Sequence, residues 1–306
     1  MSFADWLVLA STLLFIVIYG VWKTRQNKDL TAYLKGSNQM NWSTIGLSVM
    51  ATQASAITFL STPGQAYESG MGFVQNYFGL PLALLVVSIV FIPIFYKLNV
   101  FTAYEYLEKR FDVRIRSLAA FLFLIQRGLA AGITIYAPAI ILSTVLDWNL
   151  RVTILFVGGL VIIYTVSGGT KAVSLTQKFQ MTIILAGMLL AFFLVIDKFP
   201  SEVSLSDALY VAGNANKLDA VNFSLDPSER YTVWSGLLGG FFLALSYFGT
   251  DQSQVQRYLG GKSVKESRLG LMFNAMLKIP MQFFILLIGV MVFVFYQFQP
   301  HSVIFN

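Results

Sequence analysis

The chain has 306 residues, of which 56% are hydrophobic and only 12% are charged. An average soluble chain is about one quarter charged, so this composition excludes a soluble enzyme, a disordered chain and a nucleic-acid-binding protein. The sequence contains no cysteine and a single histidine, His301. Disulfide bonds, thiolate metal sites, cysteine nucleophiles and histidine clusters are therefore excluded as well.

Long apolar runs account for the mean hydropathy of +0.68. A bilayer-spanning helix needs about 20 mostly apolar residues. The first run carries no Lys or Arg before it and no small-residue cleavage motif after it, so we interpret it as a span rather than a signal peptide. We expect an all-α integral membrane protein with about eight transmembrane helices, at residues 5–22, 43–62, 73–96, 117–146, 152–167, 173–196, 232–250 and 269–298.

The positions of the basic residues predict how the chain crosses the membrane. Fifteen of the 21 lysines and arginines fall in four alternate connecting segments, at residues 23–35, 97–116, 171–178 and 257–268. Loops rich in Lys and Arg face the cytoplasm. This pattern places the N-terminus on the extracellular or periplasmic side, and it explains the net charge of +6 without a nucleic-acid partner.

Two of the predicted helices have unusual compositions. In the second, six of the fourteen residues 48–61 carry a hydroxyl or an amide, and Pro63 and Gly64 follow. The seventh contains four glycines in a short run, at Gly236, Gly239, Gly240 and Gly249. Discontinuous helices at corresponding positions of two inverted repeats mark the substrate and ion sites of transporters. The alternative is that these small residues only allow close helix packing.

Four motifs resemble those of the sodium/solute symporter family. Residues 51–67, ATQASAITFLSTPGQAY, resemble its first core helix, and residues 102–111, TAYEYLEKRF, resemble the cytoplasmic loop after the next helix. Residues 164–180, YTVSGGTKAVSLTQKFQ, resemble its Gly-Gly signature, and residues 250–258, TDQSQVQRY, resemble the motif after its sixth core helix. The motifs occur in the family's order and at its spacing, which makes the combination specific.

The resemblance implies a LeuT-like inverted-repeat fold. A peripheral helix and its cytoplasmic loop would occupy residues 1–42, and the first five-helix repeat residues 43–197. An extracellular loop would follow at 198–231, and the first two helices of the second repeat at 232–306. The second repeat would then be incomplete, so we expect a C-terminally truncated fragment. The implied function is sodium-coupled symport of a small organic or anionic solute across the cell membrane by alternating access.

Sodium is the coupling ion that the resemblance implies. Apart from Glu68 and Asp251 near membrane boundaries, no acidic residue falls within a predicted span, which argues against an embedded carboxylate as a proton relay. By resemblance, the backbone carbonyls of Ala51 and Ala54 supply part of the sodium site, and oxygen ligands suit this hard cation. Gln177 stands where the family usually has the Asp of a second cation site, which favours a single coupled sodium ion.

The resemblance also implies substrate contacts. By alignment, Ser55 and Thr58 face the substrate, and Gln75 or Asn76 is a polar contact from the next helix. Tyr247 matches an aromatic inner gate of sugar-transporting relatives, and the alternative is an interfacial or core tyrosine.

Two basic residues inside predicted spans bear on the charge of the substrate. Arg127 lies midway along the fourth span, where an unpaired guanidinium is costly and no intramembrane carboxylate is expected beside it. It either anchors backbone carbonyls or binds the anionic group of a substrate such as a carboxylate. Lys278 resembles a family lysine near the substrate cavity, and the alternative is that its amine snorkels to the cytoplasmic face. Ala244 replaces an Asn that binds the ligand in sugar and sialic acid transporters, which weakens a sugar interpretation.

Two other functions remain alternatives to sodium-coupled symport. One is a membrane sensor or regulatory module derived from a transporter, and the other is a LeuT-like amino-acid transporter of another family. An intramembrane enzyme would need clustered His, Asp or Glu residues, which the sequence lacks.

Overall fold

The computed structural model describes residues 39–299, together with positions 7, 11, 12, 14 and 18. Those five positions are helical, and the rest of the predicted first span, 5–22, lies outside the described residues. The described part is helical apart from connecting loops and one isolated bridge between Met40 and Gly261. The expected all-α architecture is therefore confirmed.

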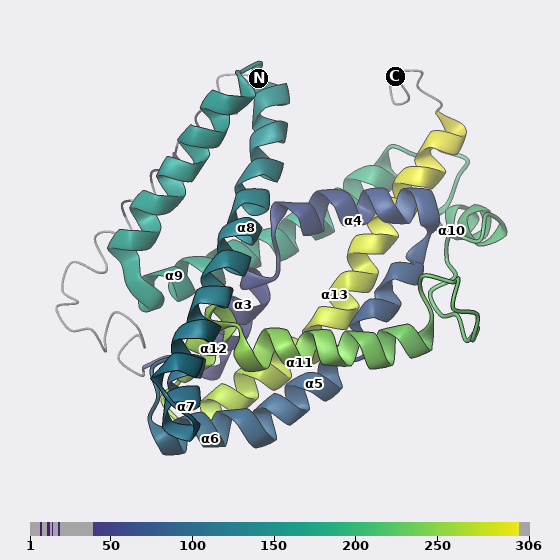
Figure 1. The fold of residues 1–306 in the computed structure, drawn as a ribbon. Coiled ribbons are helices and arrows are strands. Elements are labelled where there is room, and N and C mark those ends of the chain that lie inside the picture. The colour runs from purple at the N-terminus through teal and green to yellow at the C-terminus, as the bar shows by residue number, and fades with distance from the viewer. Residues whose placement is uncertain (1–6, 8–10, 13, 15–17, 19–38, 300–306) are drawn as a thin grey trace.

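The described helices follow the predicted spans, with local departures (Figure 1). Within the described residues, four continuous stretches are long and apolar enough to cross a membrane, and two shorter apolar helices accompany them. In chain order the elements are α3 (Trp42–Thr52), α4 (Ala56–Ser69), the 3₁₀-helix η2 (Met71–Tyr77), α5 (Leu80–Val86), the π-turn η3 (Val87–Phe91), α6 (Ile92–Leu98), α7 (Ala103–Arg110), α8 (Val113–Leu146), α9 (Leu150–Asp197), α10 (Leu205–Asn214), the π-turn η4 (Ser235–Gly239), α11 (Gly240–Thr250), α12 (Gln252–Leu259) and α13 (Val264–Phe298).

Polar side chains explain where most of these helices begin. A side-chain oxygen just before a helix accepts a backbone N–H of the first turn, which would otherwise lack a partner. Seven helices start in this way, at Asn41, Thr102, Asp112, Asn149, Ser204, Asp251 and Ser263. These caps determine where each of these helices begins in the largely apolar sequence.

Helix α13 lies in the middle of the fold and packs against α3, α4 and α9. Its glycines allow close approach to the second predicted span. A Cβ atom on Gly289 would lie 2.1 Å from the carbonyl oxygen of Pro63, and one on Gly270 would lie 2.7 Å from Ile45. Because α13 touches α3 and α4 so closely, it fixes the position of both helices.

Helices α8 and α9 present apolar side chains to the surroundings. Within α8 only Ala139 is buried, whereas Leu129 is 70% exposed, and Leu155 of α9 is 76% exposed. Apolar surface of this extent is rare on a soluble monomer. The arrangement suits helices that face lipid.

Two predictions about the spans need correction. The predicted fifth and sixth spans belong to the single helix α9, although the parts before and after residues 164–172 run in different directions in Figure 1. The prediction that the seventh span is discontinuous is wrong, because η4 continues into α11 and helical structure first stops at Asp251. Gly236 and Gly240 serve packing instead, since a Cβ on Gly236 would lie 1.9 Å from the carbonyl oxygen of Gln75 and one on Gly240 would lie 2.5 Å from that of Asn76.

Candidate functional site

The second predicted span is interrupted between α3 and α4, at Gln53, Ala54 and Ser55. Gln53 keeps dihedral angles in the right-handed helical region, with φ −96° and ψ −11°, whereas Ser55 is extended, with φ −89° and ψ 169°. The chain thus leaves one helix and enters the next within three residues. The interruption lies inside the hydroxyl-rich run 48–61, so the predicted break in this helix is confirmed.

The hydrogen bonds of the interruption stay local. The N–H of Gln53 donates to the carbonyl of Met50 at 3.1 Å, and the N–H of Ala54 donates to that of Ala51 at 3.0 Å. The Thr58 hydroxyl donates to the carbonyl of Gln53 at 3.2 Å. Of the two alanines predicted to bind sodium, Ala51 lies in the last turn of α3 and Ala54 lies within the interruption.

A cavity of about 410 Å³ adjoins the interruption. Ala54 and Ser55 line one side, and Phe59 and Pro63 of α4 lie beside them. The Ser55 hydroxyl makes no capping hydrogen bond to α4, so it can serve a ligand in the cavity. The other walls come from apolar residues of α9 and α13, at Ile184, Gly187, Met188, Ala191, Ile285 and Ile288.

Gln177 of α9 contacts the hydroxyls of α3. Its Oε1 accepts hydrogen bonds from the Ser48 hydroxyl at 2.8 Å and from the Thr52 hydroxyl at 3.4 Å. The Thr52 hydroxyl is also within 2.8 Å of the Ser48 carbonyl. This neutral cluster lies one turn before the interruption and contains no carboxylate.

A stripe of buried polar side chains runs along α13, and sequence analysis identified only one of its members. Asn274, Lys278 and Gln282 follow at intervals of four residues, which places them on one helix face. Each is at most 1% exposed. The amides of Asn274 and Gln282 have no hydrogen-bond partner among the described residues. In the sequence, the spacing of these three polar residues within an apolar span could have predicted this buried stripe.

The Lys278 amine lies inside the protein. Its Nζ is 5.4 Å from the centre of the Tyr77 ring, and within the described chain it forms no ion pair. The snorkelling alternative is therefore wrong, because the side chain is buried between helices rather than extended to the surface.

Arg127 of α8 has a partner that the sequence interpretation missed. Its Nη1 lies 3.5 Å from Oδ2 of Asp251. The prediction that no carboxylate pairs with Arg127 is wrong, because the fold brings the residue that follows α11 against α8. The ion pair supports the anchoring alternative for Arg127, and its role in substrate binding stays a prediction.

Gln75 is buried and fully hydrogen-bonded. Its Nε2 donates to the carbonyls of Gly72 at 3.2 Å and Tyr231 at 3.1 Å, and its Oε1 accepts from the N–H of Asn222 at 2.9 Å. These bonds fasten the loop 198–231 to η2. Neither Gln75 nor its neighbour Asn76 lines the cavity beside the interruption. The hydrogen bonds give Gln75 a structural role, and the substrate contact of Gln75 or Asn76 stays a prediction.

Tyr247 of α11 is half-buried and does not line the cavity beside the interruption. Its ring meets that of Phe248 edge to face, with centroids 5.3 Å apart, and it packs on the hydrophobic cluster that includes Ala244 and Leu84. This environment matches the alternative of a core tyrosine. The role of Tyr247 as an inner gate stays a prediction.

Comparison with protein families and curated relatives gives consistent matches. The model of the sodium:solute symporter family matches residues 33–304. The chain is 32% identical over 278 residues to the sodium-coupled monocarboxylate transporter 2 of Bos taurus, covering 89% of this chain and 45% of that protein. It is also 32% identical over 275 residues to the sodium/iodide cotransporter of Homo sapiens, covering 88% and 42%. The chain thus spans less than half the length of these relatives.

A solved structure resembles the whole chain. It is the substrate-bound outward-open state of a Na⁺-coupled sialic acid symporter, with a TM-score of 0.90 and 31% sequence identity. The match covers 100% of this chain and 64% of that chain.

Proposed function

This chain belongs to the sodium:solute symporter family, and from that membership we propose that it forms part of a sodium-coupled symporter for a small organic anion. It has a LeuT-like fold and is a multi-pass membrane protein. The relatives named above are transporters. The proposed activity therefore concerns movement of a solute rather than its chemical conversion.

The observation that carries this proposal is the interruption of the second span at residues 53–55 beside a cavity. Unwound helices expose backbone groups that a membrane interior tolerates only next to protein or a wet cavity. Transporters use such breaks to hold ions and substrates together. The interruption, which lies against α9 and α13, is the one place where the predicted ligands Ala51, Ala54 and Ser55 come together.

Sodium would bind at the α3 side of the interruption. The C-terminal end of a helix carries partial negative charge, and the carbonyls of Ala51 and Ala54 are oxygen ligands of the kind that a hard cation prefers. Among the described residues there is no group of three His, Cys, Asp or Glu side chains that could hold a metal. The neutral amide at Gln177 supports a single coupled sodium ion.

The substrate would lie on the α4 side, near Ser55 and Thr58. The N-terminal end of a helix favours negative charge. Lys278 is a buried positive charge on α13, the helix that also forms one wall of the cavity, whereas the charge of Arg127 is already matched by Asp251. The names of the three related transporters specify a monocarboxylate, iodide and sialic acid, which are all anions. These features together support a small anion as the solute.

The proposed orientation follows from the basic loops. Segments 97–116 and 257–268 would face the cytoplasm, and the N-terminus would lie outside the cell membrane. Sodium and the solute would then enter from the side of the loop 198–231, and the two repeats would rock to expose them inside.

Ligand binding by the purified chain tests this proposal. Binding of radiolabelled lactate is measured in sodium chloride and in choline chloride at equal ionic strength. We expect saturable binding only with sodium, competition by iodide and no competition by a neutral sugar. Equal binding in choline would overturn the coupling, and competition by the sugar alone would overturn the anion preference.

A further inference from the structure

Asp251 occupies the junction between α11 and α12 and connects several elements. It is 7% exposed and extended, with φ −72° and ψ 115°. Its Oδ1 accepts the N–H of Ser253 at 2.8 Å and the Ser253 hydroxyl at 2.5 Å, which caps α12. Its Oδ2 forms the ion pair with Arg127 of α8. One carboxylate thus joins the start of α12 to a helix more than a hundred residues earlier.

The next residue, Gln252, fastens the same junction to α7. Its Oε1 accepts the N–H of Ala103 at 3.0 Å, and its Nε2 donates to the carbonyl of Phe101 at 3.2 Å. Its backbone also hydrogen-bonds Tyr104. Burial raises the pKa of Tyr104 to about 12, the hydrogen bond from Gln252 lowers it, and the charge of Asp251 raises it. The pKa of Tyr104 therefore responds to both residues of the junction.

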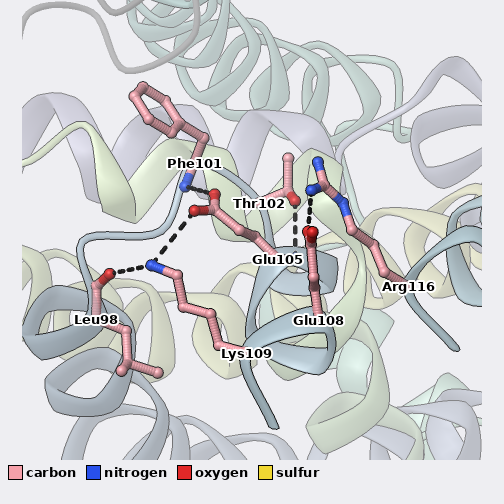
Figure 2. A network of polar contacts seen from close by, with 7 residues as sticks. All are labelled: Leu98, Phe101, Thr102, Glu105, Glu108, Lys109 and Arg116. Carbon is pink, nitrogen blue, oxygen red and sulfur yellow. Dashed lines mark hydrogen bonds and ion pairs between the residues drawn. The ribbon is translucent and has the colours of Figure 1, made fainter. Parts of the chain in front are cut away.

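Helix α7 is itself held firmly to its neighbours, as Figure 2 shows. Glu105 accepts the N–H of Phe101 at 2.7 Å, and Lys109 pairs with Glu105 at 3.4 Å while donating to the carbonyl of Leu98 at 2.6 Å. Arg116 of α8 forms an ion pair with Glu108. Because α7 is tied to α6 and α8, any displacement of α12 must break the contacts of Asp251 and Gln252.

Space for such a displacement exists beside the junction. A cavity of about 590 Å³ lies between α6, α7, α8 and the end of α11. It is lined by Tyr104, Ala119, Gln126 and Thr250, and the last two directly precede Arg127 and Asp251 in the sequence. The junction is therefore bordered by open volume on one side and by fixed contacts on the other.

We propose that Arg127, Asp251 and Gln252 form a latch between the predicted repeats, which holds the α7–α12 end of the bundle closed until transport requires it to open. In this proposal they are positioning residues, since they act on the helices and none of them lines the cavity beside the interruption. The inference rests on the proposed function, because only a transporter needs this end to open.

The absence of cysteine from the chain allows a direct test by single-cysteine labelling. Ala119→Cys places a thiol in the cavity wall without altering the latch. In nanodiscs, the rate of reaction with a hydrophilic maleimide is measured in this background for Arg127→Gln, Asp251→Asn and the double variant. Asn also caps helices well, so Asp251→Asn removes the charge while preserving the start of α12.

We expect labelling to accelerate about fivefold or more in each single variant, and no further in the double variant, since both changes break one ion pair. Arg127→Lys keeps the charge and should label as slowly as the starting protein. The matched control is Arg114→Gln, which removes an exposed arginine of α8 that forms no ion pair within the described residues, and its labelling should not change.

Unchanged labelling in both single variants, additive effects in the double variant, or an equal acceleration in Arg114→Gln would overturn the latch. A single elution peak in gel filtration shows that each variant is folded. Sodium-dependent lactate binding by the unaltered chain reports the proposed function separately, so failure of one inference is distinguishable from failure of the other.

Discussion

At the scale of single residues, Lys278 is the buried charge to which we assign the preference for an anionic substrate. Its side chain is 1% exposed, and its amine lies over the Tyr77 ring. Burial of an unmatched charge is costly, and an anionic ligand would offset that cost. The sequence alone left open whether this amine reached the membrane surface, because snorkelling depends on which helices cover it.

Lys278→Gln should weaken lactate binding about 10-fold or more, since a hydrogen bond to a charged group contributes about 1.5–3 kcal/mol. The change also removes a buried charge, so the unfolding temperature should not fall. Equilibrium binding and thermal unfolding check the two expectations. Lys262→Gln, at an exposed position before α13, is the matched control. Unchanged lactate affinity in Lys278→Gln would contradict the assignment.

Gly236 shows how a glycine can serve packing rather than flexibility. Gly236→Ala would bring a methyl group to 1.9 Å from the carbonyl oxygen of Gln75, and overpacking of this kind costs about 1–3 kcal/mol. We expect a lower unfolding temperature in detergent. Gly239→Ala is the matched control, because a Cβ there meets nothing within 4 Å. Equal unfolding temperatures for the two variants would refute the packing role.

At the scale of elements, the sequence predicted the interrupted helix for a physical reason. Hydroxyls and amides are disfavoured in lipid unless protein surrounds them, and their density in 48–61 marked this helix as internal. The exact break at 53–55 was not predictable, because neither Gly nor Pro marks it and the packing of α13 determines it. The prediction of a break in the seventh span failed, because its glycines Gly236 and Gly240 lie against the backbone of η2.

Contacts between elements that are far apart in the sequence account for most of the other differences between the predictions and the structure. Arg127 and Asp251 are far apart in the sequence, and nothing in either local pattern indicates that they pair. The hydrogen bonds of Gln75 to Tyr231 and Asn222 of the loop were likewise not predicted, and its substrate contact stays a prediction. Predictions from spacing describe one helix at a time, so partners contributed by other elements escape them.

The bonds of Gln75 make a second element, the loop 198–231, dependent on η2. Gln75→Met keeps the length of the side chain but removes three hydrogen bonds to backbone groups, each contributing about 1 kcal/mol. We expect trypsin to cleave after the exposed Arg230 about 10-fold faster, because local opening becomes easier. Gln299→Met, which removes one exposed hydrogen bond to Lys198, should leave the rate unchanged. Equal cleavage in all three proteins would show that Gln75 does not hold the loop.

At the scale of the whole molecule, α13 connects the packing of the fold with the candidate site. It packs on both halves of the interrupted helix and carries the stripe of Asn274, Lys278 and Gln282. The family and its LeuT-like fold could be predicted from four motifs in order, because motif order reflects the complete topology. The predicted boundaries between the repeats stay predictions, as do the sodium ligands.

Hydrogen–deuterium exchange of the purified chain, compared in sodium chloride and choline chloride at equal ionic strength, tests the central claim most directly. Peptides that cover residues 47–60 should exchange more slowly with sodium, because carbonyls at the interruption would bind the ion and order the backbone. Peptides from α7 should exchange equally in both salts. Identical exchange of residues 47–60 in sodium and choline would contradict the claim that the interrupted helix binds sodium.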